Sequence, residues 1–231
     1  MARPIWTGTI SFGLLQVPVR LMTAERRTDL HFHMLDSRDN SPIRYERVNS
    51  ETGAEVPWKD VVKAFEYSKG NYVVIDKEDM QEAAPESLES VDIESFVDPV
   101  EIDARYYDKP YYLLPAKHGE KGYVLLRETL RKTGLAGVAR VVIRTREHLA
   151  LVIAEERTLL LMLLRFPQEL IDEDAYELPA AGKGRLKISA REMQMAHKLV
   201  ESMHEPWKPS NYRDDYRDKL SKVIERRLKS K

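Results

Sequence analysis

The stretch GVARVVIRTREHLALVIAEERTLLLMLLRF, residues 137–166, indicates the fold more clearly than any other part of the chain. It holds three runs rich in β-branched residues and leucine, at 137–145, 148–154 and 158–166, with short polar breaks between them. Such residues favour strands, and short breaks join strands that are neighbours in one sheet. We therefore expect consecutive strands of a closed or strongly curved sheet.

Further strands are predicted upstream. Residues 71–75 are rich in β-branched and aromatic residues, and apolar and polar residues alternate over 100–106 and from 91 to 94, as a half-buried strand requires. Between these strands and the run at 137, Tyr123, Leu126 and Leu130 recur at helical spacing within 122–132. This spacing predicts one helix packed on the sheet.

The C-terminal part of the chain is predicted to be helical. Ser189 and Glu192 form a capping-box pattern, which marks the start of a helix. Its apolar face would hold Met193, Ala196, Leu199, Val200 and Met203. After Pro206, Trp207 and Pro209 a second helix is expected, with Tyr212, Tyr216, Leu220, Val223, Ile224 and Leu228 on one stripe. The predicted fold is mainly β with α (α+β), with a β body at 1–187 and a helical arm at 188–231.

Composition excludes several classes of protein. The absence of cysteine removes disulfides, thiolate metal sites and thiol catalysis. The longest apolar run, 159–164, is far shorter than the roughly 20 residues of a membrane-spanning helix. The N-terminus shows no secretory signal. A cytoplasmic protein without a membrane partner is expected.

The formal net charge of −1 hides a segregation of charge. Residues 76–103 carry eleven acidic groups against one base, which gives −10, whereas 117–148 carry eight bases against three acids, which gives +5. Residues 183–231 carry fourteen bases against seven acids, which gives +7. A chain of this kind can present one basic face despite its near-neutral total.

Catalytic motifs are not found. The loop at 180–184 lacks the first glycine and the Ser or Thr of a phosphate-binding loop. His31 and His33 would share one face of a strand, and the acids of 76–103 could add metal ligands, so a metal-dependent nuclease is one alternative. A solvated acidic surface explains these carboxylates better, and we expect no catalytic residue, metal or cofactor.

Basic residues suggest a binding role. Those at 117–146 span the predicted helix and the strand after it, and Arg140, Arg144 and Arg146 have the even spacing of one strand face. Such a face could contact phosphates, although a solvated edge with scattered ion pairs explains the same pattern. Aromatic residues do not interleave these bases, which favours contact with a duplex backbone over stacking on single strands.

Several motifs resemble those of one family in the same order. They are Trp6–Leu14 followed by Val17-Pro18-Val19, Phe65-Glu66-Tyr67 with 70–73, Pro110–Pro115, Tyr123–Arg127 and Arg146–Ala150. Together they resemble the bacterial Ku proteins over nearly the whole chain, with a departure at Ala64 and Phe65, where glycine and tyrosine are usual. Many bacterial relatives have a longer lysine-rich tail, so a chain ending at Lys231 is expected to be a minimal or shortened form.

The resemblance implies a Ku-type β-barrel core, a loop that bridges over DNA, and a helical C-terminal arm that embraces a second subunit. The expected homodimeric ring would thread onto double-stranded DNA ends, protect them, and recruit the multifunctional bacterial DNA ligase of non-homologous end joining, with a docking surface around 212–231. An architectural protein that coats DNA without needing an end is the alternative. The phosphate contacts expected on the inner wall of the ring are Arg144 and Arg146, then Arg140, Lys117, Lys121, Arg127, Arg131 and Lys132, and in second line Arg20, Arg44 and Arg47.

Overall fold

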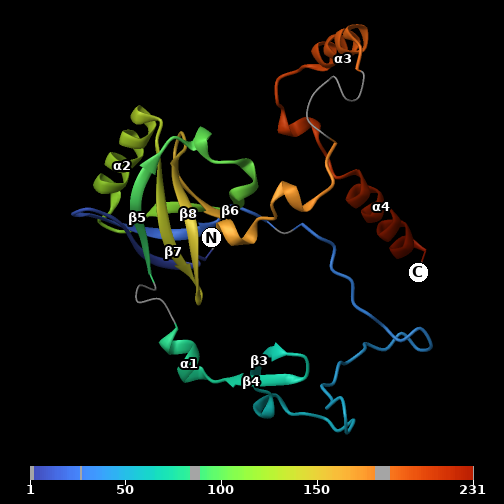
Figure 1. Cartoon of the computed structure of the whole chain (residues 1–231). Helices are drawn as coiled ribbons and strands as arrows, with labels where there is room; N and C mark the ends of the chain where they lie inside the picture. Colours follow the sequence, from blue (N-terminus) through green and yellow to red (C-terminus); the bar gives the residue numbers. More distant parts are fainter. Residues whose placement is uncertain (1–2, 27, 84–88, 180–187, 231) are drawn as a thin grey trace. The chain divides into compact units, whose positions relative to one another are not determined.

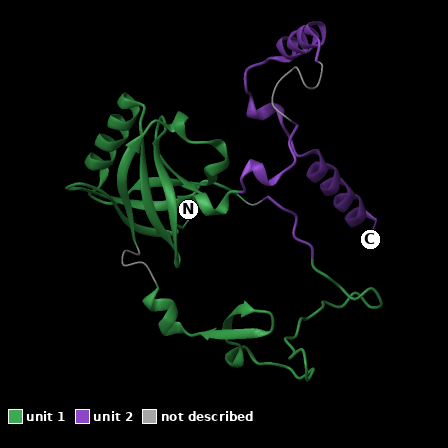
Figure 2. Cartoon of the chain, viewed as in Figure 1, with its two compact units in different colours: residues 1–27, 33–170 green, residues 28–32, 171–231 purple. Residues whose placement is uncertain are grey.

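The computed structural model describes residues 3–26, 28–83, 89–179 and 188–230. The chain forms two compact units, one of residues 1–27 and 33–170 and the other of residues 28–32 and 171–231 (Figure 2). The units separate after Leu170. The predicted boundary after residue 187 adjoins residues 180–187, which are outside the described residues. The loop at 180–184 also lies outside the described residues. The proposed division into core and arm stays a prediction.

The first unit contains a closed seven-stranded barrel (Figure 1). Around the barrel the strands follow the order β1-β2-β6-β9-β8-β7-β5, and every neighbouring pair is antiparallel except β1 with β5. The curved sheet predicted from 137–166 is confirmed, as is the strand at 91–94. The bounds are β1 Trp6–Phe12, β2 Leu15–Thr23, β5 Ser90–Val97, β6 Tyr107–Pro115, β7 Ala136–Ile143, β8 Arg146–Ala154 and β9 Leu159–Leu164.

Alternate residues of these strands fill the barrel. Ala150 and Val152 of β8 belong to the main core together with Leu113 of β6 and Leu161 of β9, and all four are fully buried. Each fully buried leucine or valine stabilises the fold by roughly 1.5–3 kcal/mol relative to an exposed side chain. Because side chains alternate along a strand, every second residue counted from a buried one points into the barrel, also near the strand ends.

Helix α2 (Glu120–Thr133) closes one end of the barrel. It starts just after β6 ends and finishes just before β7 begins, so it lies at that end of both strands (Figure 1). Tyr123, Leu126 and Leu130 are buried, as the spacing predicted. The Tyr123 hydroxyl donates to the Leu113 carbonyl at 2.7 Å and accepts from the Leu159 amide at 2.7 Å. These two bonds join the helix to the rims of β6 and β9.

The chain between β2 and β5 leaves the barrel and contains its own small elements. They are a 3-10 turn at Trp58–Asp60, strands β3 (Lys63–Ser68) and β4 (Asn71–Ile75), and helix α1 (Lys77–Glu82). β3 and β4 form a two-stranded antiparallel sheet, which confirms the strand predicted at 71–75. In this sheet every residue except Ile75 is exposed.

The strand predicted over 100–106 is wrong. Two 3-10 turns, Pro99–Glu101 and Ala104–Tyr106, occupy that region. The Asp98 carboxylate accepts from the Val100 amide at 3.0 Å, and the Asp103 carboxylate accepts from the Arg105 amide at 2.9 Å. Local bonds of this kind compete with a strand ladder, so the alternation of apolar residues did not decide the structure here.

The second unit contains helices α3 (Ala190–Met203) and α4 (Asp215–Lys229) and 3-10 turns at Glu173–Ala175 and Pro209–Asn211. A further 3-10 turn, Pro167–Glu169, ends the first unit. The capping box is confirmed, since Ser189 and Glu192 each accept from the other's amide. Tyr212 does not belong to the second helix as predicted: Asp214 caps α4 further along, and the Tyr212 ring stacks on Trp207 at 4.7 Å between ring centres.

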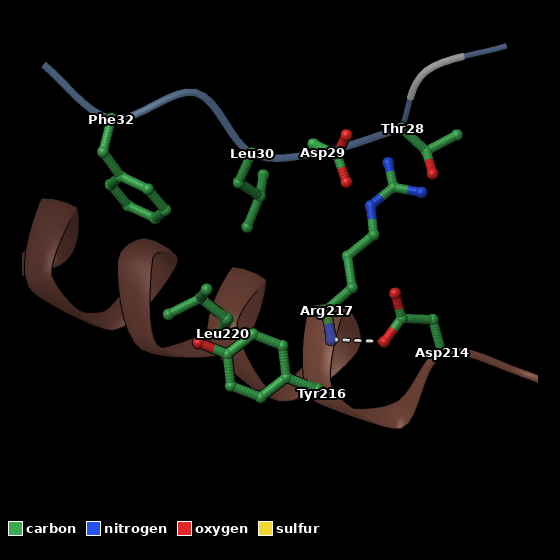
Figure 3. Close-up of a pocket in the computed structure, with 8 residues that line it drawn as sticks. All are labelled: Thr28, Asp29, Leu30, Phe32, Asp214, Tyr216, Arg217 and Leu220. Atoms are coloured by element: carbon green, nitrogen blue, oxygen red, sulfur yellow. Dashed lines mark hydrogen bonds between the residues drawn. The ribbon is translucent and has the colours of Figure 1, made fainter. Parts of the chain in front are cut away.

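Residues 28–32 run along α4 within this second unit (Figure 3). Leu30 and Phe32 face the helix side that carries Tyr216 and Leu220, and the Arg217 side chain extends towards Asp29 (Figure 3). The hollow between the segment and the helix measures about 190 Å³. The segment that follows β2 thus covers part of the apolar stripe of α4.

Candidate nucleic-acid interface

The end of the barrel away from α2 opens into a basic hollow of about 530 Å³. Its lining contains inward-facing positions beyond the last core layer, where hydrophobic side chains give way to polar ones. His148 precedes the buried Ala150 by two residues on β8, and Thr23 follows the buried Leu21 by two residues on β2. The residues around the hollow are Ile5, Thr23, Lys109, Tyr111, Ile143, Arg144, Thr145, Arg146 and His148. We call this the barrel mouth.

Arg144 and Arg146 lie at the rim of the barrel mouth. Ile143 pairs with Arg146, so Arg144 and Thr145 form a two-residue hairpin turn between β7 and β8. Arg144 has a φ of 64°, the left-handed region that such hairpin turns require and that glycine or asparagine adopts more readily. Both side chains are exposed, and the described residues place no carboxylate within ion-pair distance of either. They remain available for an anionic ligand.

The prediction that Arg140, Arg144 and Arg146 share one strand face is wrong, because the chain reverses at 144–145. Arg140 lies on the outside of β7, where its guanidinium contacts Glu94 at 2.7 Å and Glu147 at 2.9 Å. Bonds to these two carboxylates raise the pKa of Arg140 above its ordinary value. For Arg140, the structure therefore shows the ion pairs that were the alternative to phosphate contact in the sequence analysis.

The other predicted bases of this region gather around α2, at the closed end of the barrel. Lys117, Lys121 and Lys132 are exposed, and within the described part of the chain none has an ion-pair partner. Arg127 instead bonds Glu128 at 2.7 Å and the Arg157 carbonyl at 2.9 Å, and Arg131 lies 3.6 Å from Glu128. About 25 Å of strand separates this end from the barrel mouth. The predicted bases therefore form two clusters rather than one continuous face.

The second-line bases are dispersed. Arg20 on β2 donates to the Pro115 carbonyl at 3.3 Å. Arg44 pairs with Glu46 at 2.5 Å, and Arg47 lies over the Trp58 ring at 4.8 Å from its centre. The role of all these residues in DNA contact stays a prediction.

The acids of 76–103 do not build a metal centre among the described residues, which hold no group of three His, Asp or Glu suited to an ion. Several of them cap local turns. Asp76 and Asp79 form the capping box of α1, and Asp98 and Asp103 cap 3-10 turns. Asp92 accepts from the Ser11 hydroxyl across the β1–β5 seam and from the Ser90 hydroxyl on its own strand. Their clustering in sequence reflects local structure rather than a shared site.

Two residues of the barrel mouth were missed at the sequence level. Lys109 points over the Tyr111 ring, 5.6 Å from its centre, and its Nζ lies 3.4 Å from Glu25. His148 is half-buried, and burial together with the Arg146 guanidinium lowers its pKa below the ordinary value. His148 stands two residues before the buried Ala150 on β8, and this spacing could have indicated from the sequence that its side chain points into the barrel.

Comparison with known proteins agrees with this arrangement. The structure contains a barrel with basic residues at both ends, and residues 11–195 match the family model described as the Ku70/Ku80 beta-barrel domain. A non-homologous end joining protein Ku of Coxiella burnetii is 48% identical, covering 99% of this chain and 84% of that protein. The Ku proteins of Pseudomonas aeruginosa and Archaeoglobus fulgidus are 43% and 35% identical, over 97% and 98% of this chain and 76% and 88% of theirs.

The chain belongs to the prokaryotic Ku family of non-homologous end joining proteins. Members of this family bind DNA ends in repair and carry out no catalysis, so the chain is a DNA-end-binding protein and not an enzyme. Among the described residues, no helix is both long and apolar enough to cross a membrane.

Proposed function

We propose that two copies of this chain form a ring that threads onto double-stranded DNA ends, protects them and recruits the DNA ligase of end joining. The ring would hold duplex DNA through its phosphate backbone, without reading sequence. It would act on the nucleoid in the cytoplasm. Preference for ends then follows from geometry, because a closed ring can be entered only from a terminus.

The observation that carries the proposal is the large apolar surface that a single chain leaves exposed. On α3, Leu199, Val200 and Met203 are 61%, 70% and 73% exposed, and they belong to the apolar face that the sequence predicted for this helix. A contiguous exposed apolar stripe marks an interaction surface. A second copy of the chain is the partner that the family architecture favours.

The β3–β4 sheet supports the same conclusion. An isolated two-stranded sheet is marginally stable at best in water. Phe65 and Val73 pair and share one face, Tyr67 follows at a bulge in β3, and all three side chains are exposed. Contact with a partner would stabilise this sheet, and we propose that the segment between β2 and β5 bridges over the DNA in the dimer.

The experiment compares binding to a linear duplex with binding to the same DNA as a covalently closed circle at matched salt. Stable binding to the linear form alone, restored when the circle is cut, supports threading. Equal binding to both would favour the architectural alternative.

The dimer is tested by light scattering, in which Val200→Asp with Met203→Asp should release monomers. A dimer unaffected by these changes would contradict the assignment of α3.

Helix α4 is the proposed ligase-docking surface. Residues 28–32 cover part of its stripe, but Tyr216 in the first turn and Leu228 in the basic last turn remain 75% and 69% exposed. Deletion of 210–231 should abolish stimulation of ligation, and Leu228→Asp should reduce it without loss of DNA binding. Val100→Asp, which places the same charge on an exposed apolar side chain of the first unit, is the matched control. Unchanged stimulation by the deleted chain would refute this docking surface.

A further inference from the structure

The barrel mouth has the features of a binding pocket rather than of a flat contact surface. Mouths of barrels are common ligand sites, and a hollow of about 530 Å³ lies within the usual size range of such sites. Tyr111 and Ile143, both buried, contribute apolar surface at its base. Around them stand charged side chains from β6, from β8 and from the turn between β7 and β8.

The charge of the barrel mouth fits an anion. Lys109, Arg144 and Arg146 contribute three permanent positive charges, and the nine lining residues include no acid. Two acids lie just outside the lining: Glu25 pairs with Lys109 at 3.4 Å, and Asp108 pairs with Arg165 at 2.9 Å. Lys109 would therefore have to share its charge between Glu25 and a bound phosphate, whereas Arg144 and Arg146 have no ion-pair partner among the described residues. The hydroxyls of Thr23 and Thr145 add hydrogen-bonding capacity. Guanidinium and ammonium groups in this arrangement suit phosphate oxygens.

The recessed shape selects among phosphates. The internal phosphates of a duplex are diesters with one negative charge each, and they lie along a continuous ridge. A terminal phosphate is a monoester that projects from the strand, and it carries up to two negative charges with a second pKa near 6. A pocket with several converging cations therefore favours the terminal group.

We propose that the barrel mouth binds the terminal phosphate of a DNA strand, with Lys109 and His148 as ligands in addition to Arg144 and Arg146. This inference rests on the proposed function, in which the protein sits at DNA ends. It assigns to the barrel a distinction between phosphorylated and unphosphorylated ends, in addition to backbone contact.

Proton uptake at His148 should accompany binding. In the free pocket, burial and Arg146 lower the pKa of His148, against the opposing effect of Asp108 and Glu169. Lys109 and Arg144 add further positive charge from β6 and from the turn. A phosphate dianion opposes these cations and favours the protonated ring. The preference for a phosphorylated end should therefore increase as the pH falls from 8 to about 6.5, and level off near pH 6, where the phosphate itself takes up a proton.

The test uses hairpin duplexes with one open end that carries either a 5′-phosphate, a 3′-phosphate or hydroxyls alone, with the full chain at fixed salt and pH 6.5. The wild-type chain should prefer one phosphorylated end by about tenfold, which equals about 1.4 kcal/mol. Lys109→Met and His148→Gln should reduce this preference, measured for each variant against its own affinity for the hydroxyl end, to about threefold or less. Lys208→Met, at an exposed lysine between α3 and α4, removes the same charge outside the pocket and should keep the full preference.

Failure of the inference and failure of the proposed function give different results. Equal affinity for phosphorylated and hydroxyl ends, with ends still preferred over closed circles, overturns the terminal-phosphate pocket alone. Loss of end preference on every substrate refutes the ring. Inorganic phosphate provides a further probe, since it should shift the NMR resonances of the His148 ring, assigned through His148→Gln. A shift with phosphate but no preference among DNA ends would mean that the pocket takes free phosphate, which also overturns the proposal.

Discussion

Neutralising Arg144 and Arg146 should weaken DNA binding and make the affinity less dependent on salt, because both effects follow from lost phosphate contacts. Each phosphate contact made by a cation contributes about 0.9 to the slope of log affinity against log salt. The double variant Arg144→Gln, Arg146→Gln removes two contacts per chain, hence four in the proposed homodimer. The slope should become less steep by about 3.6, and the affinity at 0.15 M salt should fall by about a thousandfold.

Arg140 provides the matched control, because the structure already satisfies its charge. Its guanidinium contacts Glu94 and Glu147 on the outside of the barrel. Arg140→Gln removes the same charge from the same hairpin, and it should change the slope by less than about 0.5. The assay is a fluorescence titration of a linear, hydroxyl-ended duplex at four or five salt concentrations, which keeps any terminal-phosphate contact out of the comparison.

Two results would refute this reasoning. An unchanged slope for the double variant would mean that Arg144 and Arg146 do not contact phosphates. An equal change of slope for Arg140→Gln would mean that Arg140 contacts DNA despite its two ion pairs. Ion pairing in the free chain would then not identify which basic residues contact DNA.

Three further predictions concern stability, measured by chemical unfolding at one protein concentration. Tyr123→Phe leaves two buried backbone groups without their partner and should cost about 2–4 kcal/mol. Tyr112→Phe, on an exposed side chain whose hydroxyl has no hydrogen-bond partner among the described residues, should stay within about 0.5 kcal/mol. Because the folded-state pKa of His148 is lowered, the unfolded chain binds more protons and stability falls as the pH drops below about 6.5; His148→Gln should reduce that loss, and an identical pH profile would contradict it. Gly8→Ala should cost more than about 3 kcal/mol or prevent folding, because the added Cβ would lie 1.9 Å from the Glu89 carbonyl oxygen, and a stable variant would show that the β1–β5 seam can open.

The sequence predicted those parts of the fold in which local pattern and packing agree. The three strands of 137–166 and the helix around Tyr123 are confirmed, since each buries the face that its period marks. Over 100–106 the alternation pointed to a strand, but aspartate caps at Asp98 and Asp103 stabilise 3-10 turns instead. β6 was not predicted from its pattern, because Lys109 and Pro110 interrupt it.

The candidate site was less predictable, because it depends on which strands become neighbours. Glu94 stands 46 residues from Arg140 in the sequence, and only the pairing of β5 with β7 brings the two together. The reversal at 144–145 separates Arg146 from Arg140 in the same way. Spacing along the chain identified the basic residues, whereas closure of the barrel decided which of them are paired and which line its mouth.

The seam between β1 and β5 has a consequence for how this protein can change over evolution. β1 pairs with β2 on one side and with β5 on the other, so the chain leaves the barrel after Thr23 and returns at Ser90 to a strand that is already in place. Residues inserted or lost between these points alter neither the register nor the closure of the barrel, and the entropic cost of a longer loop rises slowly with its length. The length of the segment that we propose to cross the DNA can therefore change in evolution while the barrel stays the same. Related proteins could in this way enclose DNA ends that carry different bound proteins or structures.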